Sequence, residues 1–171
     1  MFHEGQPVAP EGPKWWKHDH GPYDYAHTGF AWAYTRHILD LIGCLFELGG
    51  MGSADHHQAM AMVGLGEKSI PGGTSNEYRS AVMSWQDRAM AHINRKIGFV
   101  HGTIEHKHHG PKNARGYVSR WDMFVKHGFD PYADLKKNTY GVIEWAGNKP
   151  DLEREWHLYL QGRIEDANVV A

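Results

Sequence analysis

The strongest fold signal in the chain is the stretch Glu77-Tyr-Arg-Ser-Ala-Val-Met-Ser-Trp-Gln-Asp-Arg-Ala-Met-Ala-His-Ile-Asn-Arg-Lys96. Its apolar face recurs every three or four positions, at Ala81, Val82, Trp85, Ala89, His92 and Ile93. This spacing puts the six residues on one side of a helix, so it predicts a long amphipathic helix over residues 77–96 that packs against a core.

The residues before this helix predict a short strand, two helices and a glycine-rich turn. A glycine-rich turn, residues 49–55, leads into a predicted helix over residues 55–63, with Asp55 at its exposed N-terminal end. Residues 25–34 are aromatic and β-prone and predict a short strand. A helix over residues 35–41 follows, and Thr35 is a possible N-cap.

The residues after the long helix predict few strands. Residues 97–104 alternate and predict a strand, and a helix is expected over residues 115–127. A hairpin is expected over residues 138–145, and a closing helix over residues 149–165 that begins near Pro150. We therefore expect an irregular N-terminal arm over residues 1–24 and one helix-rich α/β domain with few strands over residues 25–171.

Composition excludes several classes of protein. The 171 residues are 41% hydrophobic, enough for a core, and their net charge of −2 provides no bulk positive field to hold nucleic acid, so no nucleic-acid partner is expected. The single cysteine, Cys44, lies in an apolar run and is expected to be buried. No signal peptide and no membrane-spanning stretch is seen, so we expect a cytoplasmic protein without a membrane partner.

Two polar clusters are the best candidates for chemistry. Four histidines fall within nine residues, at His101, His106, His108 and His109. His106 and His109 can converge on a metal ion from a turn, although a polar exposed loop is the simpler interpretation. The favoured case is a metal held together with carboxylates and a phosphate-bearing ligand, with Lys112 and Arg115 on the phosphates.

Asp55 is the best candidate carboxylate, because the glycine-rich turn lets a ligand approach and the helix start presents the side chain. The alternative for Asp55 is a helix N-cap. Trp32 is an aromatic that could stack on a sugar, with a place in the core as its alternative.

The order of these motifs resembles the C-terminal half of GT-A-type, family-2-like glycosyltransferases of phages and bacteria. The resemblance runs from Gly29-Phe-Ala-Trp-Ala33 through Gly52-Ser-Ala-Asp-His-His57 and Gly98 to Thr103. It continues through His106-x-x-His109-Gly110, Arg115-x-Tyr117, Arg120-Trp121, Phe129-Asp-Pro131 and Asp134 to Arg163-x-Glu-Asp166. It covers residues from about 25 to 167, and the ordered combination is more specific than any single motif.

The resemblance implies transfer of a sugar from a nucleotide-sugar to a glycan or other acceptor, with manganese or magnesium bridging the diphosphate. Asp55 would be the acceptor-side base or binder, and His106 or His109 the metal or phosphate ligand. Lys112 and Arg115 would contact the diphosphate, Trp32 would line the acceptor or sugar wall, and Tyr117 belongs to the same donor-binding group.

The chain departs from the family pattern in two places. Where an aromatic is expected inside the histidine run, it has Lys107-His108, which weakens a sugar-stacking role there. No Asp-x-Asp motif follows a predicted strand, so the nucleotide-binding half is not seen. Three alternatives remain: the chain is a fragment, a second chain supplies the other half, or the acceptor-side module serves another use.

Two other classes of function stay open beside the transferase. One is a metal-dependent nuclease or hydrolase built on the histidines and Asp55. The other is a non-catalytic binding module or a virion-associated module.

Overall fold

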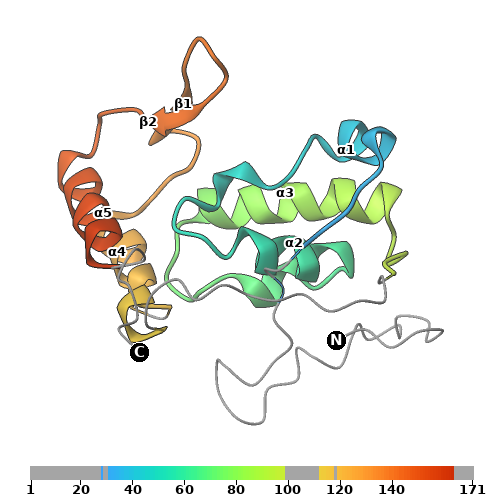
Figure 1. Ribbon diagram of the computed structural model, residues 1–171, viewed down its shortest axis with the longest axis horizontal. Helices are drawn as coiled ribbons and strands as arrows, with labels where there is room; N and C mark the ends of the chain where they lie inside the picture. Colours follow the sequence, from blue (N-terminus) through green and yellow to red (C-terminus); the bar gives the residue numbers. More distant parts are fainter. Residues whose placement is uncertain (1–27, 29–30, 99–111, 118, 164–171) are drawn as a thin grey trace, which may run out of the picture. The chain divides into compact units, whose positions relative to one another are not determined.

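The computed structural model describes residue 28 and residues 31–98, 112–117 and 119–163 (Figure 1). The chain divides into two compact units, one made of residues 1–70 and 80–104 and the other of residues 71–79 and 105–171. Helix α3, Asn76–His92, gives its first turn to the second unit and the rest to the first. Within the described residues the fold is helix-rich, and its two strands form one small antiparallel sheet.

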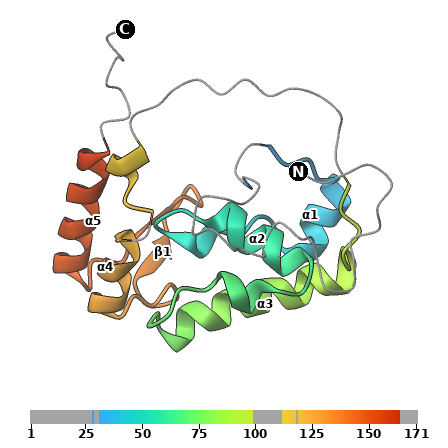
Figure 2. The ribbon, with the colours of Figure 1, turned by 90° about the horizontal axis from the view of Figure 1, so that it is seen from below.

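The first unit is built along α3. It contains α1 (Arg36–Ile42), the 3₁₀ turns η2 (Glu47–Gly49) and η3 (Gly66–Ser69), and α2 (Ala54–Met62). Figures 1 and 2 both place α2 alongside α3. The indole nitrogen of Trp85 donates to the carbonyl of Cys44 at 3.1 Å, and the guanidinium of Arg88 donates to the carbonyl of Ile42 at 2.8 Å. These two bonds from α3 hold the end of α1.

The apolar face predicted for the long helix is the core face of the first unit. Five of its six members are buried, namely Ala81, Val82, Trp85, Ala89 and Ile93, whereas His92 is exposed. Every residue from 57 to 63, which covers most of α2 and the residue after it, is buried. Each large apolar side chain buried in this way stabilises the fold by roughly 1.5–3 kcal/mol.

The second unit has two helices and a hairpin. Its elements are η4 (Lys112–Arg115), α4 (Arg120–His127), β1 (Leu135–Lys137), β2 (Ile143–Trp145) and α5 (Pro150–Gly162). Leu135 pairs with Trp145 and Lys137 with Ile143. Asn138 closes the turn, since its side-chain oxygen accepts from the backbone N–H groups of Tyr140 and Val142.

An aromatic cluster forms the core of the second unit. The Phe124 and Phe129 rings stack with their centroids 4.0 Å apart, and Tyr78 packs against both. Trp121 lies edge-on to Tyr78 at 5.7 Å. Burial raises the pKa of Tyr78, although the nearby charge of Arg120 lowers it.

Most predicted elements are confirmed. The helices expected over residues 35–41, 55–63, 77–96 and 149–165 are present as α1, α2, α3 and α5, although α3 ends at His92 and residues 93–96 are not helical. The hairpin expected over residues 138–145 is present, but its first strand, β1, lies earlier, at Leu135–Lys137. Thr35 is the N-cap of α1, because its hydroxyl accepts from the N–H of Ile38 at 3.2 Å. Pro150 starts α5, where its missing N–H costs no helical bond.

Three predictions are wrong or shortened. Residues 31–34 form no strand. The helix expected over residues 115–127 begins at Arg120, because Gly116 has φ +50° and interrupts the helical backbone after η4. Cys44 is exposed and was expected to be buried; it lies in the turn that ends α1, where its φ is 70°.

Some predictions lie outside the described residues. They include the N-terminal arm over residues 1–24 and most of the strand expected over residues 97–104, of which residues 97 and 98 are described and are not in a strand. None of the described helices combines the length and apolar character that a bilayer crossing requires.

Candidate functional site

Asp55 is presented by a strained turn at the start of α2. Gly50 and Gly52 have φ of 57° and 97°, and Ser53, which is not a glycine, has φ 61°. A non-glycine residue in this region costs about 1 kcal/mol or more, and such strain is common beside functional groups. The N-cap position of α2 is Ser53, so Asp55 is the second residue of the helix and is not its N-cap.

The carboxylate of Asp55 is held by a threonine far away in the sequence. The hydroxyl of Thr28 donates to Asp55 Oδ2 at 2.8 Å. The carbonyl of the same Thr28 accepts from the indole nitrogen of Trp32 at 2.7 Å. Asp55, Thr28 and Trp32, all half-buried, therefore form one hydrogen-bonded group, which we call the Asp55–Trp32 group. It joins the two candidate residues of the first unit through Thr28, which the sequence did not indicate.

Tyr34 extends the aromatic part of this group. Its ring stacks with Trp32 at a centroid distance of 6.3 Å and an interplanar angle of 25°. Its hydroxyl lies 3.7 Å from the sulfur of Met62 in α2. Burial raises the pKa of Tyr34 to about 12, so Tyr34 is neutral near pH 7 and supplies no charge to the site.

His57 stabilises the packing of the first unit. His57 is buried, and its Nδ1 lies 2.8 Å from the hydroxyl of Ser69, which in turn donates to the carbonyl of Gly66 at 2.5 Å. Because that hydroxyl has one proton, Nδ1 of His57 carries the proton shared with Ser69. The ring also lies edge-on to Phe46. His57 thus fastens η3 to α2.

The donor-side candidates lie in the second unit, where Arg115 and Tyr117 are brought together. The guanidinium of Arg115 donates to the hydroxyl of Tyr117 at 2.9 Å, and the carbonyl of Arg115 accepts from the hydroxyl of Tyr159 at 2.9 Å. The guanidinium of Arg120 stands 5.3 Å from the centre of the Tyr117 ring. Lys112 begins η4, three residues before Arg115.

The proposed metal ligands His106 and His109 lie outside the described residues, as do His101 and His108. Among the residues that are described, no three His, Cys, Asp or Glu side chains gather closely enough to hold a metal ion.

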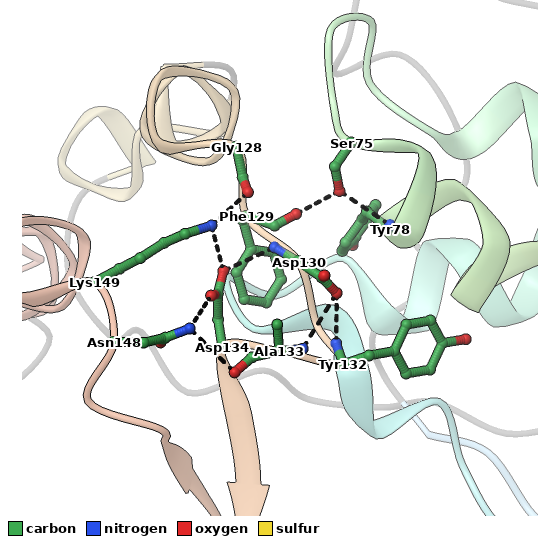
Figure 3. Close-up of polar contacts among 10 residues, drawn as sticks. All are labelled: Ser75, Tyr78, Gly128, Phe129, Asp130, Tyr132, Ala133, Asp134, Asn148 and Lys149. Carbon is green, nitrogen blue, oxygen red and sulfur yellow. Dashed lines mark hydrogen bonds and ion pairs between the residues drawn. The ribbon is translucent and has the colours of Figure 1, made fainter.

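A second carboxylate cluster, which the sequence did not single out as a site, surrounds Asp134 (Figure 3). Asp134 Oδ2 accepts from the Lys149 ammonium and from the backbone N–H of Asp130, both at 2.8 Å, and Oδ1 accepts from Asn148 at 2.9 Å. Burial by itself would raise the pKa of Asp134, but these hydrogen bonds and the charge of Lys149 outweigh it, so the pKa is lowered.

The Asp134 cluster joins three segments of the second unit. Lys149 also donates to the carbonyl of Gly128 at the end of α4, and Asn148 to the carbonyl of Ala133. Since every oxygen of Asp134 is engaged and its side chain is 1% exposed, the cluster is a structural junction.

A groove of about 310 Å³ lies between α4 and α5 and is lined mainly by charged residues. Its charges are paired within it: Glu155 contacts Lys126 at 2.8 Å and His127 at 2.9 Å, and Arg154 contacts Asp151 at 2.8 Å. The groove therefore offers little net charge to a ligand.

Comparison of the chain with models of known protein families, with characterised proteins and with solved structures gives no match. Support for a candidate site therefore comes from the geometry of its residues. In the first unit this geometry offers a carboxylate linked through Thr28 to an indole, and in the second a guanidinium that donates to a phenol.

Proposed function

We propose that this chain is the acceptor-side half of a GT-A-like glycosyltransferase, which moves a sugar from a nucleotide-sugar to a hydroxyl of an acceptor. The Asp55–Trp32 group is the observation that supports the proposal. It combines a carboxylate that has one engaged oxygen with an indole, and proteins commonly use this pair to bind a sugar hydroxyl and a sugar ring.

In the proposed reaction Asp55 is the base. The acceptor oxygen forms a bond to the anomeric carbon of the donor sugar, and the bond from that carbon to the diphosphate oxygen breaks. The electron pair of the broken bond leaves with the nucleoside diphosphate. Asp55 Oδ1 takes the acceptor proton and later returns it to water.

On the donor side, Arg115, Tyr117 and Lys112 are proposed to bind the diphosphate. The bond from Arg115 to the Tyr117 hydroxyl supports this role, because a guanidinium fixed in advance loses less conformational entropy when it meets a phosphate. A second chain is proposed to supply the Asp-x-Asp half of the nucleotide site.

His106 and His109 are proposed to hold manganese or magnesium, which would neutralise charge on the leaving diphosphate when bound.

Calorimetric titration of the full chain with Mn²⁺, with and without UDP or GDP, tests the proposal. Metal binding that requires the nucleoside diphosphate is the expected result. Metal binding without nucleotide, together with cleavage of a phosphodiester, would support the hydrolase instead. Absence of binding in both titrations would contradict the donor-side assignment and favour a non-catalytic module.

Variants make this titration specific. His106→Ala and His109→Ala are expected to abolish the nucleotide-dependent binding. His37→Ala is the matched control, because His37 is an exposed histidine on α1. Equal losses in all three variants would reject His106 and His109 as ligands.

A further inference from the structure

Thr28 contacts both candidate residues of the first unit through different atoms. Its side-chain hydroxyl donates to Asp55 Oδ2 at 2.8 Å, and its main-chain carbonyl accepts from Trp32 Nε1 at 2.7 Å. One residue thus links an acid 27 positions away to an indole four positions away. Replacing the side chain of Thr28 removes the first bond and leaves the second possible.

The bond from Thr28 decides which way the Asp55 carboxylate points. An aspartate in the first turn of a helix commonly turns back to the free N–H groups there. The side chain of Ser53, the N-cap residue of α2, makes no capping hydrogen bond, and the Asp55 carboxylate meets the Thr28 hydroxyl. Threonine is β-branched and has restricted χ1 rotation, so the direction of its hydroxyl is well defined.

The two oxygens of Asp55 are consequently unequal. Oδ2 is engaged by Thr28, whereas Oδ1 accepts no hydrogen bond from the residues that the structure describes. A carboxylate fixed at one oxygen presents the other in a defined direction, which is the requirement for a base that must meet an acceptor hydroxyl within about 3 Å.

We infer that Thr28 is a positioning residue of the proposed transferase: its hydroxyl fixes the Asp55 carboxylate so that Oδ1 faces the acceptor hydroxyl. This inference rests on the proposed function. Thr28 does not touch the reacting atoms, and it acts through Asp55. Serine keeps the hydroxyl at this position, and valine keeps the shape without it.

A double-mutant cycle in urea tests the link between Thr28 and Asp55 without any substrate. We expect Thr28→Val to lower the urea midpoint of the wild-type chain and to cause no further shift in an Asp55→Ala background. Equal shifts in the two backgrounds would overturn the inference.

Thr74→Val is the matched control for this cycle. The hydroxyl of Thr74 donates to the carbonyl of Pro71 at 2.9 Å, and Thr74 belongs to the second unit. The shift in urea midpoint that Thr74→Val causes should therefore be the same with and without Asp55. A Thr74→Val shift that also vanishes in the Asp55→Ala background would show that the cycle reports general destabilisation, and this outcome too would overturn the inference.

Turnover tests the catalytic consequence. The probes are UDP-glucose, UDP-galactose, UDP-N-acetylglucosamine and GDP-mannose, with water as the acceptor hydroxyl and release of the nucleoside diphosphate as the signal. Thr28→Val should lower kcat on the order of 10- to 100-fold and change KM for the donor by less than about twofold, since only orientation is lost. Thr28→Ser should restore most of kcat.

The failures of the two proposals are distinguishable. Mn²⁺ binding by the wild-type chain that does not depend on UDP or GDP overturns the proposed function, while the urea cycle still decides whether Thr28 acts through Asp55. An active wild type with an equally active Thr28→Val, or with a Thr28→Ser as impaired as Thr28→Val, overturns the positioning role alone.

Discussion

Asp55 in the first unit and Asp134 in the second are two aspartates with opposite surroundings. Asp134 is buried and accepts hydrogen bonds from Lys149, Asn148 and the N–H of Asp130, on both of its oxygens. Asp55 is half-buried and, among the described residues, accepts one hydrogen bond, from Thr28. A carboxylate with both oxygens engaged stabilises the fold, whereas a carboxylate with one engaged oxygen keeps lone pairs that can accept further hydrogen bonds.

The difference comes from the number of lone pairs on each carboxylate that no hydrogen bond occupies. Each hydrogen bond to a carboxylate favours its charged form and occupies a site where a proton would bind. Asp134, with both oxygens engaged and a lowered pKa, is a poor base and a strong anchor. Asp55 has one oxygen engaged by a described residue.

Asp134→Asn should have the largest effect on stability. It removes the charge opposite Lys149 and puts an N–H₂ where acceptors are needed, so we expect the free energy of unfolding to fall by about 3 kcal/mol. Urea unfolding followed by circular dichroism measures this loss. A loss below about 1 kcal/mol would contradict the anchor role.

Asp55→Asn should instead affect turnover. With the base removed, kcat for nucleoside diphosphate release should fall by about 10²- to 10³-fold, because general base catalysis contributes that order of magnitude. Its free energy of unfolding should change by less than about 1 kcal/mol, since one half-buried hydrogen bond is altered. Weaker substrate binding with unchanged turnover would reject the base assignment.

Low pH should remove the stabilisation that the charged Asp134 carboxylate gives to the fold. Because its folded pKa lies below its unfolded value near 4, its stabilisation is fully present above about pH 4 and is lost as the pH falls through the folded pKa. Urea midpoints measured from pH 7 to pH 2 should therefore decline more steeply for the wild-type chain than for Asp134→Asn. Parallel declines would assign the acid sensitivity to other groups.

Trp32→Phe should have a smaller effect on the first unit. Phenylalanine retains a ring that can stack but cannot donate to the carbonyl of Thr28, so we expect a loss of about 1 kcal/mol in unfolding free energy. Turnover should fall several-fold through looser placement of Thr28. Tyr140→Phe, a change at an exposed ring, is the control and should alter neither quantity.

Glu155→Gln should have the smallest effect. Glu155 has two partners, Lys126 and His127, but its side chain is 39% exposed and solvent screens the pairs. Hydrogen bonds from Lys126 and His127 lower the pKa of Glu155, yet such exposed pairs contribute only about 0–1 kcal/mol. Urea unfolding at low and high salt checks this. A loss as large as that of Asp134→Asn would show that burial does not separate the two acids.

Local signals predicted the helices well. The apolar period of residues 77–96 and the turn before residue 55 are properties of neighbouring residues, and the corresponding helices α3 and α2 are present. The strand expected over residues 25–34 failed at residues 31–34, because there the Trp32 indole bonds back to Thr28 and no partner strand pairs with the segment in the described structure.

The candidate site was predictable only in part. Asp55 stood out because a glycine-rich turn precedes it, and Arg115 and Tyr117, two residues apart, are indeed in contact. Thr28 gave no signal, since a threonine that holds a carboxylate 27 residues away looks like any other threonine. Asp134 was visible as a motif residue, but its three hydrogen bonds come from segments that meet only after folding.

By itself the sequence determined which segments are helical, where glycine and proline begin or end them, and which residue types could carry chemistry. These properties depend on backbone sterics and on side-chain spacing within a few residues. The tertiary structure alone decided that Asp134 is anchored and that Asp55 is held at one oxygen. A hydrogen bond between distant residues depends on the path of the whole chain between them, which no local pattern encodes.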